Sequence, residues 1–202
     1  MKIFYERNLP HWQPPGATLF LTYRLQGSIP MPVLNQIREY AAQCTSAAYA
    51  RLFGVDLDRE LYAIQRRWFG QYDTALHNTP NGPYWLAEKS NALIVAESIH
   101  WCAARYFELF AYCIMSNHVH LLIKHHIGAP QLRDIMKSHK GYTGLHCNKA
   151  IGRNGKYWQE ETYDHVVRND TEFERIRTYI LQNPVKAGLV KRWEDWPWTF
   201  LA

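Results

Sequence analysis

The chain has 202 residues, of which 47% are hydrophobic and 14% aromatic, a composition typical of a globular protein with a sizeable core. Its four cysteines include no Cys-x-x-Cys pair, which argues against disulfides and against a cysteine-based zinc site. No run approaches the roughly 18 apolar residues of a membrane span, and the N-terminus lacks the apolar core of a signal peptide. We therefore expect a cytoplasmic protein with no membrane partner.

The formal net charge of +5 favours a polyanionic partner, and the charge is unevenly distributed. Between Gln131 and Arg192 there are twelve lysines and arginines against seven acids, so this segment alone carries an excess of +5. A solvated face of ordinary helices would also explain such an excess. Charge by itself therefore leaves the partner open.

The N-terminal part is expected to contain an extended arm, a strand and two helices. Prolines between residues 8 and 16 favour an extended arm, and the β-branched and aromatic residues of 17–25 predict a strand. Apolar residues at helical spacing predict helices over 32–53 and 57–72. We find no internal repeat and no low-complexity segment.

The rest of the chain is expected to form a helix, a hairpin, a second helix, a short strand and a last helix. Their expected bounds, in chain order, are 86–105, 107–115 with 118–124, 130–148, 163–167 and 172–183, where Pro184 ends or bends the last helix. With the first strand, the order strand, helix, hairpin, helix, strand is typical of a ferredoxin-like, or split βαβ, fold.

Two histidines, His118 and His120, lie two residues apart in the second strand of the expected hairpin. Side chains alternate along a strand, so both imidazoles point to the same face. Neutral imidazole is a common ligand of divalent metals, and a strand holds it rigidly. In a chain with ten histidines, however, such a pair is more often an accident of composition. The pair indicates a metal site only in combination with other residues of the chain.

The last expected helix presents Tyr179 and Asn183, which are four residues apart and therefore lie on one helix face. If that face packs over the hairpin, the phenol and the amide oxygen meet the two imidazoles. Among 13 tyrosines, Tyr179 taken alone is more simply a packing residue. Tyr142 is the alternative nucleophile, and Tyr163 is expected in the core.

At these residues the chain resembles the REP-associated tyrosine transposases, single-tyrosine members of the HUH nuclease superfamily, which is named for its His-hydrophobic-His motif. The resemblance rests on segments that follow one another in the family's order: 115–123, 158–159, 164–168 and 179–190, with 10–17 and 196–198 also similar. Two departures are Ser116, where the family usually has proline, and the short tail after Trp198.

The resemblance implies an α+β fold of the HUH endonuclease type, a ferredoxin-like antiparallel sheet with helices on one face. It implies one transposase domain over residues 1–202, with a helical elaboration around residues 54–105. No Walker-type phosphate loop is present, which agrees with a reaction that needs no nucleotide cofactor.

The resemblance also implies a mechanism. Tyr179 would attack a single-stranded DNA phosphodiester and form a 5′-phosphotyrosine, and His118, His120 and Asn183 would hold Mg²⁺ or Mn²⁺. Rejoining would use the bond energy kept in the phosphotyrosine. Such enzymes act beside hairpins, called REP sequences, as monomers or homodimers.

We expect contacts to DNA from basic and aromatic residues of the C-terminal half. Phosphate contacts are expected from Lys137, Lys140 and Arg168, whereas Trp158 and His165 are expected near the substrate channel. Trp158 could equally be a core residue. The alternative function is a non-catalytic regulator that binds hairpin DNA and descends from such a transposase. An unrelated metal hydrolase is disfavoured, because no carboxylate is adjacent to His118 and His120 in the sequence.

Overall fold

The computed structural model describes residues 4–6, 10–78 and 82–202. Its contacts divide the chain into two compact units, one of residues 1–26 with 83–202 and the other of residues 27–82. The second unit consists of two helices packed against each other, α1 (Met31–Arg51) and α2 (Gly54–His77). Leu34, Ile37 and Trp68 are among its buried side chains. No helix within the described ranges has the length and apolar character needed to cross a membrane.

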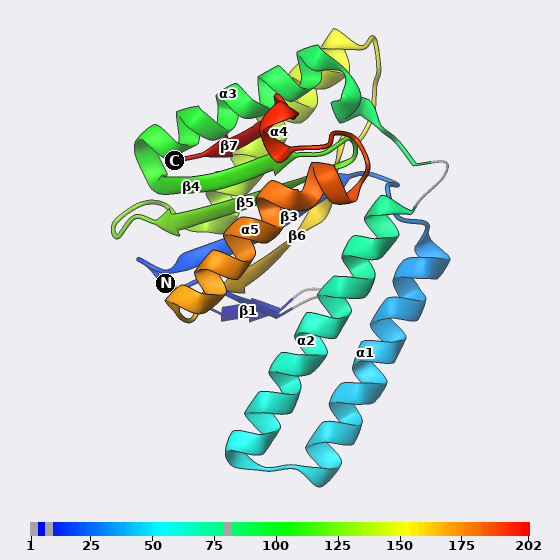
Figure 1. Ribbon diagram of the computed structural model, residues 1–202, viewed down its shortest axis with the longest axis vertical. Helices are drawn as coiled ribbons and strands as arrows, with labels where there is room; N and C mark the ends of the chain where they lie inside the picture. Colours follow the sequence, from blue (N-terminus) through cyan, green and yellow to red (C-terminus); the bar gives the residue numbers. More distant parts are fainter. Residues whose placement is uncertain (1–3, 7–9, 79–81) are drawn as a thin grey trace. The chain divides into compact units, whose positions relative to one another are not determined.

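The first unit is built on a sheet, drawn in Figure 1. Its strands and helices, in chain order, are β1 (Phe4–Glu6), β2 (Pro10–Trp12), β3 (Thr18–Leu25), η1 (Trp85–Ala87), α3 (Lys89–Tyr106), β4 (Phe107–Ile114), β5 (His118–His125), α4 (Leu132–Ala150), β6 (Trp158–Val166), α5 (Asp170–Lys186), η2 (Trp193–Asp195) and β7 (Thr199–Leu201). The expected arm, residues 8–16, contains β2, which pairs with the preceding strand β1, and its residues 8 and 9 lie outside the described ranges.

Five strands form the sheet in the order β6-β3-β5-β4-β7, and every neighbouring pair is antiparallel. The strands β3, β4, β5 and β6, with the helices α3 and α4, follow the ferredoxin-like order, and β7 extends the sheet beyond β4. The predicted α+β fold with an antiparallel sheet is confirmed. The hairpin of β4 and β5 is also where the sequence predicts it.

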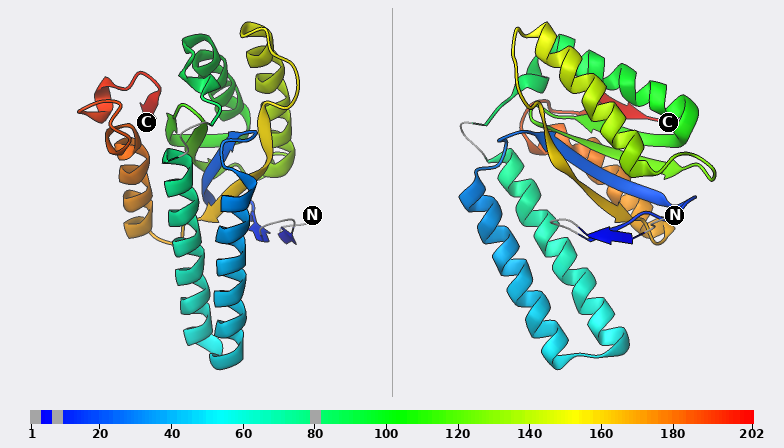
Figure 2. Two further views of the ribbon diagram at one scale, coloured as in Figure 1. Left: turned by 90° about the vertical axis from the view of Figure 1, so that its right-hand side faces the viewer. Right: turned by 180° about the vertical axis from the view of Figure 1, so that it is seen from behind.

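The two faces of the sheet differ in what they pack against. On one face Leu19, Leu21 and Tyr23 of β3 join the main hydrophobic core with residues of α3 and α4. The intervening side chains, Phe20 and Thr22, point to the other face, where α5 lies. Figure 2 shows α4 and α5 on opposite sides of the sheet. The expectation that the helices cover one face is therefore wrong, because α5 crosses to the other face after β6.

Three elements extend furthest beyond their predicted bounds: β6, α5 and α2, which runs from Gly54 to His77 where 57–72 was predicted. The strand β6 begins at Trp158 instead of residue 163, because Trp158 pairs with Leu25 of β3 beyond an irregularity between Tyr23 and Leu25. The helix α5 begins at Asp170, since the Asn169 side chain accepts a hydrogen bond from the Glu172 amide (2.9 Å) and caps the helix. Pro184 lies inside α5 and does not end it.

A polar cluster lies inside the core between α3, α4 and β3. His139 of α4 is 4% exposed, and its two ring nitrogens lie 2.9 Å from the Tyr23 hydroxyl and 2.8 Å from Ser98 Oγ. Burial lowers the pKa of His139 to about 3, and the positive charge of Lys140 acts in the same direction. His139 is therefore neutral in the folded protein at neutral and mildly acidic pH.

We expect this histidine to destabilise the fold in acid. Below pH 6.5 the unfolded chain binds a proton at His139 and the folded chain does not, so stability is lost as the pH falls from about 6.5 towards 3. Between pH 7 and 5 the loss is about 2 kcal/mol. Urea denaturation of the wild type and of His139→Gln at both pH values measures it, and equal pH dependence in the two proteins would contradict the expectation.

Candidate active site

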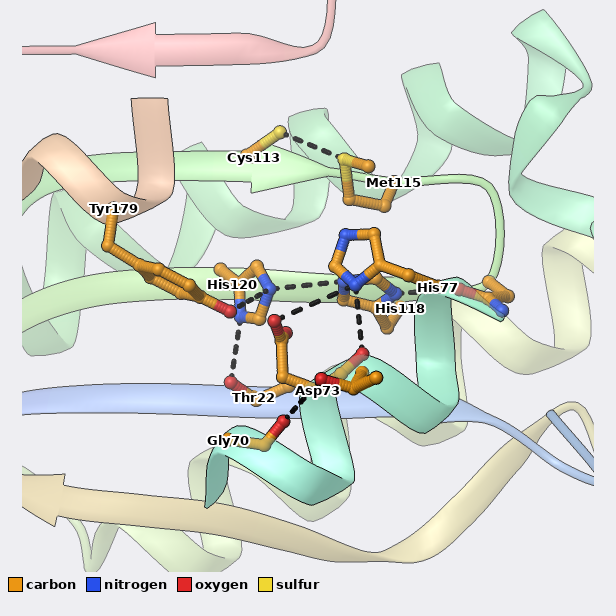
Figure 3. Close-up of polar contacts among 11 residues, drawn as sticks. Thr22, Gly70, Asp73, His77, Cys113, Met115, His118, His120 and Tyr179 are labelled. Atoms are coloured by element: carbon orange, nitrogen blue, oxygen red, sulfur yellow. Dashed lines mark hydrogen bonds and ion pairs between the residues drawn. The ribbon is translucent and has the colours of Figure 1, made fainter. Parts of the chain in front are cut away.

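The candidate site lies on the face of the sheet that α5 covers. His118 and His120 of β5 point to this face, as their spacing predicts, and their Nε2 atoms lie 3.1 Å apart (Figure 3). The Tyr179 hydroxyl of α5 lies 3.3 Å from Nε2 of His120. The structure thus brings together three predicted site residues from segments about sixty residues apart.

Each imidazole is held through its other ring nitrogen. Nδ1 of His118 lies 2.6 Å from Oδ1 of Asn117, and Nδ1 of His120 lies 2.8 Å from Oγ1 of Thr22. When Nδ1 donates its hydrogen to these oxygens, Nε2 of each ring carries the lone pair. Oxygen acceptors behind a histidine fix its tautomer and orientation in the same way at known metal sites.

This arrangement fits a divalent metal ion. Two ligands at about 2.1 Å from one ion, at roughly a right angle, lie about 3 Å apart, which agrees with the 3.1 Å between the two Nε2 atoms. At this separation one cation can contact both Nε2 atoms. The two histidines are therefore suited to form one side of a coordination sphere.

Asn183, the third predicted ligand, lies one turn after Tyr179 on the same face of α5 and is fully buried. An amide oxygen is an ordinary ligand for Mg²⁺ or Mn²⁺. Asn183 is a predicted ligand because of its place in the helix, whereas the two histidines also contact each other at Nε2.

Aromatic and cationic contacts fix the ring of Tyr179. The ring meets Phe20 edge-on at 5.9 Å and His120 at 5.2 Å between centroids, and Lys186 Nζ lies 4.8 Å from its centre. Phe20 also stacks on His120, at 5.6 Å and 26°. Tyr179 remains half-buried, so its hydroxyl is held without being fully enclosed.

The start of α5 is anchored to the end of β6. Glu172, which is buried, lies 3.0 Å from Nε2 of His165 and accepts hydrogen bonds from the Arg168 amide (2.9 Å) and the Arg175 guanidinium (3.2 Å). Burial lowers the pKa of His165, and the Glu172 carboxylate opposes that shift. These contacts hold the helix that carries Tyr179 against the sheet.

Several residues that position the site were not singled out by the sequence. Thr22, Asn117, Phe20, Lys186 and Glu172 contact the imidazoles, the tyrosine or the start of α5. Asn117 and Lys186 lie inside the segments that carry the family resemblance, which is the signal that could have identified them. Thr22 pairs with His120 only through the register between β3 and β5.

The predicted DNA contacts fall into two groups. Lys137 is exposed on α4, and Arg168 is exposed where β6 ends and α5 begins. Trp158 and His165 are instead 7% and 8% exposed. The Trp158 indole donates to Thr143 Oγ1 (2.9 Å), and His165 contacts Glu172, so the structure favours packing and anchoring roles for them over contact with DNA.

Lys140 was also predicted to bind phosphate, but its ammonium is used within the fold. Nζ donates to the carbonyl oxygens of Gln159, Glu160 and Glu161 at 3.1, 3.1 and 3.3 Å, and to Thr162 Oγ1 at 2.5 Å. An ammonium has three hydrogens, and these acceptors already compete for them. The structure therefore favours a role for Lys140 in holding β6.

The alternative nucleophile Tyr142 lies on α4, on the side of the sheet away from the two histidines. Its ring packs against His146 at 4.3 Å, and it is 54% exposed. Tyr163 packs edge-on against Phe20 at 6.1 Å and is buried, as expected of a core residue. Of these tyrosines, Tyr179 alone contacts a predicted metal ligand among the described contacts.

Comparison with known proteins finds similarity to transposases. Residues 89–183 match the family model described as "Transposase IS200 like", a span that contains both histidines, Tyr179 and Asn183. A REP-associated tyrosine transposase of Escherichia coli is 31% identical over 99 residues, which cover 47% of this chain and 54% of that protein. A protein of Haemophilus influenzae, named provisionally as a REP-associated tyrosine transposase, is 28% identical over 105 residues, 46% of this chain and 58% of that protein.

The matched region thus spans little more than half the length of these two relatives. A solved structure of a REP-associated tyrosine transposase bound to a REP hairpin superimposes with a TM-score of 0.52, covering 96% of this chain and 80% of that one. At 18% identity this likeness concerns the fold. Together these matches confirm the resemblance that the sequence motifs indicate.

Proposed function

Starting from the confirmed resemblance to the REP-associated tyrosine transposases, we propose that this protein nicks and rejoins single-stranded DNA beside a hairpin, with Tyr179 as the nucleophile. One observation carries the proposal: the Tyr179 hydroxyl lies 3.3 Å from His120 Nε2, which itself lies 3.1 Å from His118 Nε2. The proposed nucleophile and two of the proposed metal ligands therefore lie together on one face of the sheet.

In the proposed cleavage step, the phenolic oxygen of Tyr179 attacks the phosphorus of a DNA phosphodiester. An oxygen–phosphorus bond forms to the tyrosine while the bond from phosphorus to the 3′-oxygen breaks. The phenol loses its proton to water, and the leaving 3′-oxygen gains one. The products are a 5′-phosphotyrosine and a free 3′-hydroxyl, and the reverse reaction with another 3′-hydroxyl rejoins DNA without ATP.

His118, His120 and Asn183 would hold Mg²⁺ or Mn²⁺. Such an ion, when bound, stabilises negative charge that develops on the phosphate oxygens. Asn117 and Thr22 keep the two imidazoles in the tautomer that exposes Nε2. Phe20 and Lys186 hold the Tyr179 ring, so little reorientation is needed before attack.

The proposed partner is hairpin DNA with single-stranded flanks, met in the cytoplasm by a monomer or a homodimer. Lys137 and Arg168 are exposed cationic side chains suited to phosphate contact. Anchoring by Glu172 gives His165 a positioning role in this scheme, because it fixes the start of the helix that carries Tyr179.

The proposal is tested with the wild-type protein, Mn²⁺ and end-labelled DNA hairpins taken from the inverted repeats nearest the gene. We expect a covalent protein–DNA band on a denaturing gel, together with a free 3′-hydroxyl fragment. Chelation with EDTA should remove the band. Hairpin binding without any adduct or nick would overturn the proposal and favour a non-catalytic hairpin-binding regulator.

A further inference from the structure

The turn of the β-hairpin that carries the two histidines is held by segments from outside the β-hairpin. Residues 115–117 connect β4 to β5. The Ser116 carbonyl accepts a hydrogen bond from the Leu86 amide (3.1 Å), and the Asn117 carbonyl accepts one from the Leu25 amide (2.8 Å). A proline at position 116 would fix the φ angle of this turn, whereas serine does not. The shape of the turn therefore depends on contacts from distant segments.

The C-terminal segment, residues 193–201, supplies further contacts where this turn begins. Ile114 is the last residue of β4, and its amide donates to the Trp198 carbonyl (2.9 Å). The Ile114 carbonyl accepts from the indole N–H of Trp196 (3.0 Å). The last residue pair of the β4–β7 ladder is Cys113 with Thr199, so the indole adds a bond beyond the end of that ladder.

Trp196 is itself held by the turn in which it lies. The Thr199 amide donates to the Trp196 carbonyl (3.1 Å), which closes a turn with Pro197 at its second position. Proline suits that position because its fixed φ angle matches the turn. The side chain of Trp198 packs against the main hydrophobic core. The backbone that carries the indole is therefore anchored to both the sheet and the core.

The same turn carries the residue that orients His118. Asn117 is 3% exposed, and its Oδ1 lies 2.6 Å from Nδ1 of His118. When Nδ1 donates its hydrogen to this oxygen, Nε2 of His118 presents a lone pair next to His120. Hydrogen bonds weaken steeply when their distance or angle changes. A displaced turn would therefore loosen the control of the His118 tautomer.

A second contact connects β7 to the site through side chains. Thr199 Oγ1 donates to Cys113 Sγ (3.6 Å), and Cys113 Sγ donates to Met115 Sδ (3.5 Å), the contact drawn in Figure 3. Cys113 lies directly opposite His120 in the register of β4 and β5, and side chains of such a pair share one face. The C-terminal segment thus supports the β-hairpin beside His120 as well as at the turn.

We propose that Trp196 is a positioning residue of the candidate active site. By holding the Ile114 carbonyl, its indole N–H fixes the turn at residues 115–117 and with it the tautomer of His118. The inference rests on the proposed function, in which His118 is a metal ligand. It extends the site to the C-terminal segment, which lies beyond the span 89–183 that matches the family model.

The test measures histidine tautomers in the metal-free protein without DNA. Long-range ¹H–¹⁵N correlation spectra at about pH 8, where an ordinary histidine is neutral, distinguish Nδ1–H from Nε2–H. The wild type is compared with Trp196→Phe, which removes the indole N–H. The matched control is Trp101→Phe, at a tryptophan of α3 that is 51% exposed. His125 is an internal control at the far end of β5, where Nε2 donates to the Pro130 carbonyl (2.9 Å).

We expect the Nδ1–H tautomer at His118 in the wild type. In Trp196→Phe its ratio to Nε2–H should fall by up to about tenfold, which is the ratio that one ordinary hydrogen bond sustains. His125 should keep its tautomer. Mn²⁺ affinity, measured by calorimetry, should fall by about three- to tenfold, less than the roughly 10–100-fold typical of a lost direct partner of a ligand. Trp101→Phe should behave as the wild type in both measurements.

A second variant removes the donor and keeps the size of the ring system. Trp196→3-benzothienylalanine, introduced at an amber codon, has sulfur in place of the indole N–H. It should shift the His118 tautomer in the same direction as Trp196→Phe does. Because its shape is close to that of tryptophan, it also serves as the test if the smaller phenyl ring prevents folding.

Three results would overturn the inference: an unchanged His118 tautomer in the Trp196 variants, an equal change at His125, or unchanged Mn²⁺ affinity. An equal change at His125 would indicate general loosening of β5. The tautomer measurement is independent of the adduct assay. A wild-type protein that forms no adduct would reject the proposed cleavage, whereas the dependence of the His118 tautomer on Trp196 would still be measurable.

Discussion

Tyr179→Phe is expected to abolish the covalent protein–DNA adduct, lowering its rate of formation by at least about 1000-fold. The substitution removes the hydroxyl and keeps the ring, so the contacts to Phe20, His120 and Lys186 persist. The affinity for the hairpin should therefore remain within about twofold of the wild-type value, because the substitution removes a single hydroxyl group. Adduct formation is followed on denaturing gels and binding by anisotropy.

The matched control is Tyr142→Phe, which removes a hydroxyl from an exposed tyrosine on α4. It should form the adduct at the wild-type rate. An adduct that persists in Tyr179→Phe and disappears in Tyr142→Phe would transfer the role of nucleophile to Tyr142, and with it the location of the active site.

His120→Ala is expected to abolish both metal binding and cleavage. His120 supplies one of the two facing Nε2 atoms and also contacts the Tyr179 hydroxyl. Its loss therefore removes a predicted ligand and a contact that positions the Tyr179 hydroxyl. We expect Mn²⁺ affinity to fall by more than about 100-fold, beyond the 10–100-fold typical of lost supporting contacts. Isothermal titration calorimetry with MnCl₂ measures the affinity.

Two further variants make this test specific. Thr22→Val removes the oxygen behind His120 and should weaken Mn²⁺ binding by about 10–100-fold. His126→Ala removes an exposed imidazole at the end of β5 and should change neither binding nor cleavage. If His120→Ala retained metal-dependent cleavage at the wild-type rate, the predicted ligand set would have to be abandoned.

The sequence predicts the histidine side of the site because it depends on local geometry. A strand of alternating residues puts His118 and His120 on one face, and a helix puts Tyr179 and Asn183 on one face. What brings these faces together is the packing of α5, and no local pattern states which side of a sheet a helix covers. The expectation that the helices lie on one face came from the family resemblance, and no local pattern in the sequence corrected it.

The predicted DNA contacts show the same limit. Lys140 and Trp158 have the residue types that bind nucleic acid, and they lie in a basic segment of the sequence. Their partners are Thr162, the carbonyls of β6 and Thr143, all 15 or more residues away. Lys137 and Lys140 are only three residues apart on α4, yet Lys137 is exposed while the Lys140 ammonium is bonded to carbonyl oxygens of β6.

The hydrogen bonds from Lys140 to β6 also affect whether a strand of another molecule can pair with this sheet. Within the described sheet β6 is an edge strand, and such edges offer unpaired carbonyl groups to the strands of neighbouring molecules. Three consecutive carbonyls of β6 are already engaged by the Lys140 ammonium. An added strand would have to compete with the Lys140 ammonium for these carbonyl oxygens, so we expect the lysine to disfavour strand addition at this edge.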